Sequence, residues 1–115
     1  MENIRERIKS DEIDKTVNAE KQNRHIRDNS GYIKGRSYLL DGVSAQRLVD
    51  TYHGTGREAF TGDGRWKNKE TITLDKIIGV NIDPTTGEET YTNKFVIHYS
   101  KTGTHVVPSR GRLQL

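Results

Sequence analysis

The sequence contains no cysteine among its 115 residues. Disulfide scaffolds, thiolate zinc sites and cysteine nucleophiles are therefore excluded. It also has no apolar run approaching the ~20 residues that a transmembrane helix needs, so we expect no membrane span. Only 30% of its residues are hydrophobic, and its mean hydropathy is −0.89. This composition predicts one small domain with a thin core.

Several motifs of common enzyme classes are also missing. There is no Walker motif, no dinucleotide-binding glycine fingerprint and no H-E-x-x-H zinc motif. Carboxylates are scarce near the histidines, which argues against a magnesium-dependent nuclease. We therefore expect no cofactor and no metal. A zinc site made of three histidines stays open as an alternative.

The charge of the chain is concentrated in two segments. The net charge is +3, and residues 21–50 carry six basic and three acidic side chains, while residues 84–115 carry four and two. Three of the four histidines, His25, His98 and His105, lie in these segments. Basic surface beside imidazoles favours a phosphate-bearing ligand. The alternative is a slightly basic surface without a specific partner.

The first half of the chain is predicted to contain helices and loops. Weak apolar spacing predicts helix over residues 2–28, with a break near Ser10. A second helix is predicted from Ala45 to about Tyr52, and Ser44 is its expected N-cap. The glycine-rich stretch 54–69 predicts a long surface loop.

From Glu70 onward the pattern changes to strands. Alternation and β-branched residues predict an antiparallel meander over residues 71–74, 77–82, 90–92, 95–100 and 105–107. Helices followed by such strands predict an α+β fold, with N-terminal helices packed on a roughly four-stranded antiparallel sheet.

The final hairpin brings two histidines together. A tight turn around Thr102-Gly103 pairs Ser100 with His105. Because side chains alternate along a strand, His98 and His105 then share the face opposite Tyr99. The alternative is a solvated polar face on which the two histidines are incidental.

Two further basic motifs precede the sheet. On a helix, Lys21, Arg24 and His25 share one face at positions i, i+3 and i+4. Neighbouring cations lower an imidazole's pKa, which keeps the ring neutral as a general base requires. Gly35-Arg36-Ser37 allows close approach of an anion and a bidentate arginine contact. His53, at a helix end, is expected to have no catalytic role.

Three blocks of residues together resemble a known family. They are Lys21-Gln22-x-Arg24-His25-Ile26, Gly35-Arg36-Ser37-Tyr38-Leu39 and the run from Ile97 to Pro108. They look like the bacterial polymorphic toxin type 50 domain over roughly residues 20–110. The resemblance implies a ribonuclease of the Barnase–EndoU–colicin–RelE fold with two catalytic histidines. It also implies a place at the carboxyl end of a larger delivered protein, such as a phage head-morphogenesis or secreted toxin protein.

Motifs and resemblance together predict a metal-independent endoribonuclease toxin. His25 and His105 are the expected acid–base pair, with His98 as a third catalytic candidate. The expected substrate-binding residues are Lys21, Arg24, Arg36, Ser37, Ser100, Thr104, Ser109 and Arg110. Residues 1–20 are expected to join an upstream carrier, and residues 21–115 to form the toxin domain.

The expected partners are RNA, with tRNA as one possibility, and a cognate immunity protein. The expected place of action is the cytoplasm of a target cell. The first alternative is a non-catalytic module that binds RNA or protein. A metal-dependent nuclease is the second, and a chelator distinguishes it.

Overall fold

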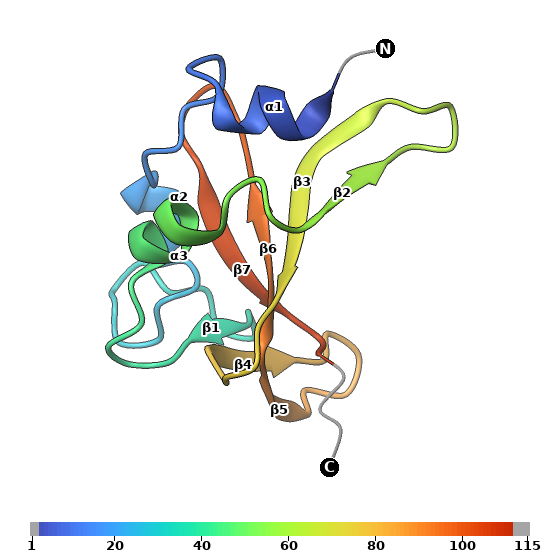
Figure 1. The fold of residues 1–115 in the computed structure, drawn as a ribbon. Helices are drawn as coiled ribbons and strands as arrows, with labels where there is room; N and C mark the ends of the chain where they lie inside the picture. Colours follow the sequence, from blue (N-terminus) through green and yellow to red (C-terminus); the bar gives the residue numbers. More distant parts are fainter. Residues whose placement is uncertain (1–2, 112–115) are drawn as a thin grey trace.

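A computed structural model of the chain describes residues 3–111 and shows three short helices and seven strands among them (Figure 1). In chain order these are α1 (Ile4–Lys9), α2 (Ala19–Asn23), β1 (Tyr38–Leu39), α3 (Ala45–Tyr52), β2 (Arg57–Phe60), β3 (Trp66–Thr73), β4 (Gly79–Ile82), β5 (Glu89–Thr92), β6 (Lys94–His98) and β7 (His105–Ser109). No helix within residues 3–111 is long and apolar enough to span a membrane.

The strands form two antiparallel sheets. The larger has four strands in the order β2-β3-β6-β7, and the smaller has three in the order β1-β4-β5. All strand pairs in both sheets are antiparallel. The predicted α+β class is therefore confirmed, and the larger sheet has the expected four strands.

The helix prediction is confirmed at α3 and only in part before it. Ser44 caps α3, and its side chain accepts a hydrogen bond from the Arg47 amide. Before it, α1 ends at Ser10, where the break was predicted, but the helix expected to follow the break is missing until α2, so the described residues 3–28 contain two short helices. The backbone between them bonds to the sheet instead of to itself, because Asn18 N–H donates to Thr104 O at 2.8 Å and Thr104 N–H donates to Thr16 O at 3.0 Å.

The predicted loop over residues 54–69 is also wrong. The segment contains β2 and the start of β3, which pair as a hairpin closed by a bond from Thr61 N–H to Arg65 O. Figure 1 shows this hairpin projecting from the body of the domain. Most of its side chains are exposed or half-buried. Within residues 57–69 none of the strand side chains is buried, so this part of the sequence shows no apolar alternation that would predict strands.

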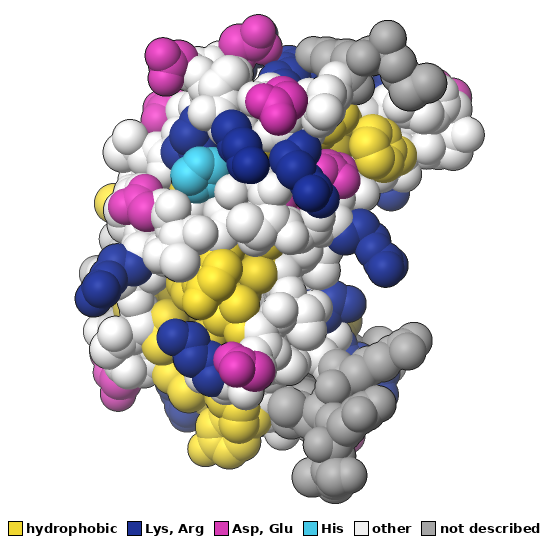
Figure 2. Space-filling model, in the orientation of Figure 1, with side chains coloured by type: hydrophobic (Ala, Val, Ile, Leu, Met, Phe, Trp, Pro, Cys, Tyr) yellow, Lys and Arg dark blue, Asp and Glu magenta, His cyan; other side chains and the backbone are white. Residues whose placement is uncertain are grey.

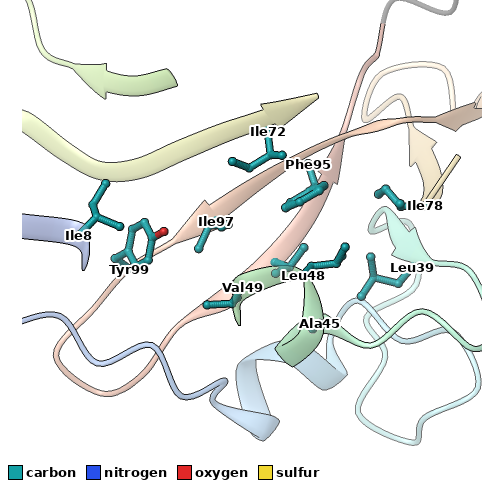
Figure 3. Close-up of a cluster of buried hydrophobic side chains, with 11 residues drawn as sticks. Ile8, Leu39, Ala45, Leu48, Val49, Ile72, Ile78, Phe95, Ile97 and Tyr99 are labelled. Atoms are coloured by element: carbon teal, nitrogen blue, oxygen red, sulfur yellow. The ribbon is translucent and has the colours of Figure 1, made fainter. Parts of the chain in front are cut away.

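The core lies on one face of the larger sheet. Phe95 and Ile97 from β6 and Val106 from β7 are fully buried there, under Ile8 of α1 and Val49 of α3 (Figure 3). Buried and half-buried residues alternate along both β6 and β7. The predicted assignment of side chains to the two faces of this hairpin is therefore confirmed.

The register of the hairpin differs from the prediction by two residues. His98 pairs with His105, whereas the tight turn had paired Ser100 with it. The wider connection has a physical cause, since Tyr99 N–H donates to Asn68 O and Thr104 bonds to the N-terminal segment. The ends of the turn therefore bond to other elements. A shift of two residues leaves both histidines on the same face.

A buried carboxylate holds the end of the core together. The side chain of Glu70, fully buried in β3, accepts from the Gly54 and Gly56 amides at 3.0 and 2.8 Å and from the Tyr99 hydroxyl at 2.7 Å. Burial, with the Glu70 hydrogen bond second, raises the pKa of the Tyr99 phenol. The donors come from two separate segments, so one side chain joins three parts of the chain.

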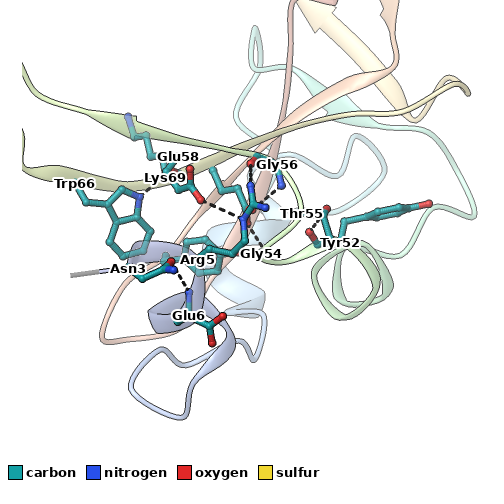
Figure 4. A network of polar contacts seen from close by, with 12 residues as sticks. Asn3, Arg5, Glu6, Tyr52, Gly54, Thr55, Gly56, Glu58, Trp66 and Lys69 are labelled. Atoms are coloured by element: carbon teal, nitrogen blue, oxygen red, sulfur yellow. Dashed lines mark hydrogen bonds and ion pairs between the residues drawn. The ribbon is translucent and has the colours of Figure 1, made fainter. Parts of the chain in front are cut away.

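Helix α1 packs onto this region. Arg5 donates to the Gly56 carbonyl and forms a 3.6 Å ion pair with Glu58 (Figure 4). Ile8 contributes a side chain with no exposed surface to the core. The described part of the predicted junction, residues 3–20, therefore contacts the rest of the domain. The domain boundary at residue 20 stays a prediction.

Apolar side chains are also present on the surface. Ile77 and Tyr91 are exposed, just before β4 and within β5. Figure 2 shows hydrophobic side chains gathered over the part of the molecule where β1 and β4 lie in Figure 1. This face belongs to the smaller sheet and is separate from the histidines of β6 and β7.

We predict that Ile8→Ala lowers the free energy of unfolding by about 2–5 kcal/mol, because it removes a fully buried side chain and leaves a cavity. Denaturant unfolding measures the change. Ile33→Ala is the control, since Ile33 is exposed and its truncation should change stability by less than ~0.5 kcal/mol. Equal stability of the two variants would show that α1 is not part of the folded unit.

Candidate active site

Two of the site's imidazoles lie next to each other on the larger sheet. His98 ends β6, His105 begins β7, and the two are direct cross-strand partners. Their ring centroids are 4.7 Å apart with an interplanar angle of 29°. Both side chains are half-buried on the face opposite the core. The hairpin register alone is therefore enough to place this pair.

The third imidazole is brought in from 80 residues away in the chain. Helix α2 lies beside the free edge of β7, where the buried Gln22 donates to Val106 O at 2.9 Å and accepts from Val106 N–H at 2.7 Å. Its side-chain amide thus pairs with the edge as another strand would. His25 follows α2, and its ring stacks on His105 with centroids 5.9 Å apart and an interplanar angle of 15°.

The result is a histidine row, His25–His105–His98, with His105 in the middle. Lys69 of β3 extends it, because Lys69 is the direct cross-strand partner of His98. Directly opposite residues share a face. Sequence reasoning missed Lys69 because it placed this residue in a loop. A strand assignment for residues 66–73 would have been needed to find it.

The tautomer of His25 follows from one hydrogen bond. Its Nδ1 lies 2.8 Å from the Ser37 carbonyl oxygen, which can only accept. Nδ1 therefore carries a proton, and in the neutral ring the lone pair is on Nε2. The residue is only 5% exposed. The protein thus holds this ring in one orientation, with its basic nitrogen defined.

All three imidazoles have a lowered pKa. Burial is the largest cause in each case. Burial and then Lys69 lower the pKa of His98 to about 4. Burial and then the neighbouring His98 and His25 lower the pKa of His105 to about 4. In His25 the hydrogen bond to Ser37 opposes the lowering. At neutral pH the free protein therefore keeps the row uncharged.

Three of the predicted phosphate-binding cations lie around the row. Lys21 and Arg24 both lower the pKa of His105 through their charge, and Arg36 acts in the same way on His25. Lys21 also donates to the hydroxyls of Ser100 and Thr102, at 3.1 and 2.8 Å. Its ammonium group is thus held over the β6–β7 connection, beside the histidines.

The predicted serines and threonine occupy different places. Ser100 lies with Lys21, and its hydroxyl also donates to Gly103 O. The Ser37 hydroxyl accepts a hydrogen bond from the Ile82 amide, so this side chain is bonded to β4. Thr104 is buried, and its hydroxyl donates to Asp14 O at 2.7 Å. The structure therefore does not bring the Ser37 and Thr104 hydroxyls to the row.

Ser109 and Arg110 lie at the other end of β7. Ser109 pairs with Lys94, four residues along β6 from His98. Arg110 is exposed and acts on the pKa of Asp83, outside the row. These two predicted binding residues are therefore separated from the imidazoles. His53 is also apart, at the end of α3, with its Nδ1 at 2.7 Å from Val49 O.

The row is not arranged as a metal centre. Within residues 3–111, no group of three or more histidine, aspartate or glutamate side chains is placed to hold a metal ion. The stacking of the rings explains why they hold no metal ion. The nitrogen lone pairs lie in the ring planes, and in nearly parallel rings they do not point toward one another. A zinc site needs lone pairs that converge on one point.

The sequence comparisons identify the family of the chain. The family described as bacterial toxin 50 matches residues 17–108, which include the whole histidine row. The match covers most of the chain, and the protein belongs to this family of bacterial toxins. The predicted resemblance is thereby confirmed. No curated protein matches the chain.

We predict that the ring protons of His98 and His105 titrate near pH 4 in an NMR titration, because burial and neighbouring cations disfavour the charged rings. In Lys69→Gln the pKa of His98 should rise, since a positive neighbour is removed. Lys76→Gln, at an exposed position before β4, is the matched control. Midpoints at the ordinary value of ~6.5 would contradict the burial of the row.

Proposed function

We propose that this toxin domain is a metal-independent endoribonuclease whose acid–base groups come from the histidine row. The observation that carries the proposal is the stacking of His25 on His105, which joins two distant basic segments at one point. Two imidazoles so close can both reach one phosphodiester. The cations around them can bind its negative charge.

In the proposed mechanism His25 is the general base. Its Nε2 lone pair accepts the proton of a ribose 2′-hydroxyl, while the bond from Nδ1–H to Ser37 O stabilises the charge that forms on the ring. The 2′-oxygen attacks the adjacent phosphorus. Because this nucleophile belongs to RNA itself, DNA would not be cleaved.

His105 is the proposed general acid. It protonates the departing 5′-oxygen, which leaves a 2′,3′-cyclic phosphate and a 5′-hydroxyl. A bound phosphate raises the pKa of neighbouring imidazoles, so substrate binding itself would charge a ring that is neutral in the free protein. His98, stacked on the other side of His105, is the third candidate, and the roles of His25 and His105 can be exchanged.

Lys21 and Arg24 are the proposed stabilisers of the pentacovalent phosphorus. Both act electrostatically on His105, so a phosphate at that ring lies within their field. Cations already positioned where charge develops lower the barrier most effectively. Arg36, which acts on His25, and Ser100, which contacts Lys21, complete the proposed substrate-binding group at the row.

The wider setting is also a proposal. Membership of a toxin family supports a cognate immunity protein and delivery as the carboxyl-terminal part of a larger protein. RNA in the cytoplasm of the target cell would be the substrate, with tRNA as one possibility. An immunity protein with an acidic patch could neutralise the cations around the row.

Cleavage products test the reaction class. Purified domain incubated with total RNA in excess chelator should cut RNA and leave cyclic phosphates and 5′-hydroxyls, because imidazoles and an internal nucleophile need no metal. DNA of the same sequence should stay intact. Products with 5′-phosphates, or complete loss of cleavage in chelator, would instead indicate a metal-dependent nuclease. RNA binding without cleavage would indicate a binding module.

The acid–base assignment predicts large effects of single substitutions. His25→Ala and His105→Ala should each lower kcat/KM for RNA by about 100- to 10,000-fold, the usual contribution of a positioned acid or base. The double variant should lose far less than the product of the two effects, because the groups act as a unit. Both activity in vitro and toxicity in cells measure the loss.

His53→Ala is the matched control, since that imidazole lies at the end of α3 and bonds to Val49 O of its own helix. It should keep near-normal cleavage. If folded His25→Ala also keeps near-normal cleavage, His98 and His105 are the better acid–base pair.

A further inference from the structure

The larger sheet has an open face that extends beyond the histidine row. Along β6 and β7 the core-facing side chains are buried, and those facing the other way are only half-buried. The strand register puts three cations on this open face together with His98 and His105, namely Arg57, Lys69 and Lys94. None of the paired positions on this face carries a carboxylate.

A groove lies at the end of this face away from the histidines. It has a volume of about 580 Å³ and is lined by Gly56, Arg57, Thr71, Thr73 and Lys94. Neither cation is paired with an acidic side chain within the described part of the chain. Two unpaired cations and two threonine hydroxyls favour an anionic ligand with several acceptor oxygens.

A second observation marks the same end of the face. Ser109 lies directly across from Lys94, and its buried hydroxyl oxygen has no hydrogen-bond partner among residues 3–111. Buried polar groups are normally satisfied, so an unsatisfied one indicates a missing partner. The hydroxyl and the Lys94 ammonium together supply donors of the kind that a phosphate oxygen accepts.

The groove and the histidine row belong to one continuous surface. Lys94 and His98 are four residues apart on β6, which is about 13 Å at ~3.3 Å per residue. The intervening positions, Thr71 and Val96, carry no charge that would repel a phosphate chain. A nucleic acid strand crossing the sheet from the row to the groove therefore meets cations at both ends.

We propose that the groove of Arg57 and Lys94 is a subsite for a backbone phosphate a short distance along the strand from the cleaved bond. The ligand class is the extended phosphodiester backbone of a single RNA strand. This inference rests on the proposed ribonuclease function, since it places the cleaved bond at the histidine row. It assigns binding, not chemistry, to the two cations.

The test compares short and long substrates. In R57Q/K94Q, kcat/KM for a dinucleotide should stay within about twofold of the unchanged protein, because such a substrate does not reach the groove. For an oligonucleotide extended on both sides of the cleaved bond it should fall about tenfold, since the variant cannot make charge-assisted hydrogen bonds to the distant phosphate. The control R47Q/K76Q removes the same charges from a different groove, beside α3, and should affect neither substrate.

A measurement of RNA binding without cleavage tests this subsite independently of the proposed catalytic mechanism. With an RNA oligonucleotide that carries a 2′-deoxy sugar at the cleavage position, R57Q/K94Q should raise Kd about tenfold. It should also reduce the slope of log K against log salt by about 0.7 for each phosphate that the variant no longer neutralises. If the protein cleaves nothing but shows this binding difference, the ribonuclease proposal fails, and the groove is confirmed as a site for an RNA phosphate without a relation to cleavage.

Three results would overturn the subsite. One is an equal loss on short and long substrates, and another is an equal effect of R57Q/K94Q and R47Q/K76Q. The third is unchanged RNA binding by R57Q/K94Q together with weaker binding of an acidic partner protein, which would make the groove a protein-binding surface. Thermal unfolding of both double variants verifies that each is folded.

Discussion

The pairing of the Gln22 side chain with the edge of β7 is the contact on which the site depends. A sheet edge presents unpaired amide and carbonyl groups, and here one buried amide side chain satisfies both groups of Val106. The helix that carries Gln22 is only five residues long, too short to be stable by itself. Its position, and with it that of His25, therefore comes from this contact and from the N-terminal segment bonded to Thr104.

The same arrangement sets the electrostatics of the row. Three imidazoles beside several cations can coexist because burial keeps them neutral in the free protein. A phosphate reverses this balance, since it compensates the cations and favours a charged ring. This balance supports the proposed anionic substrate, and the proposed reaction uses the proton that the substrate itself helps to bind.

The core explains why this surface stays in place. Ile8, Val49, Phe95 and Val106 fill one face of the larger sheet, while Glu70 joins β3 to Tyr99 and to the loop after α3. Because the core packs on one face of these strands, it also keeps the register of the residues on the open face. The residues of that face are not needed for the core, and no paired strand position on it within residues 3–111 carries a carboxylate, which supports the proposed binding of RNA.

Local sequence signals determined several elements correctly. Ser44 and the apolar spacing after it define α3, and strict alternation assigns His98 and His105 to the face opposite Tyr99. The three linked blocks were sufficient for the family. The helix and the face assignment each depend on residues close in the chain, so propensity and periodicity are enough to predict them.

The tertiary structure decided the rest. Residues 14–18 bond to Thr104 instead of forming a helix. The part of the β2–β3 hairpin within residues 57–69 has no buried side chain, so it shows no apolar alternation. The turn after β6 is wider than predicted because its ends bond to other elements. Lys69 could join the site only through the register of β3 and β6. Likewise, the sequence placed His25 in a basic helix, but no local signal specifies its distance to His105. That distance is set by contacts between segments some 80 residues apart. The residues next to His25 in the sequence do not specify such contacts.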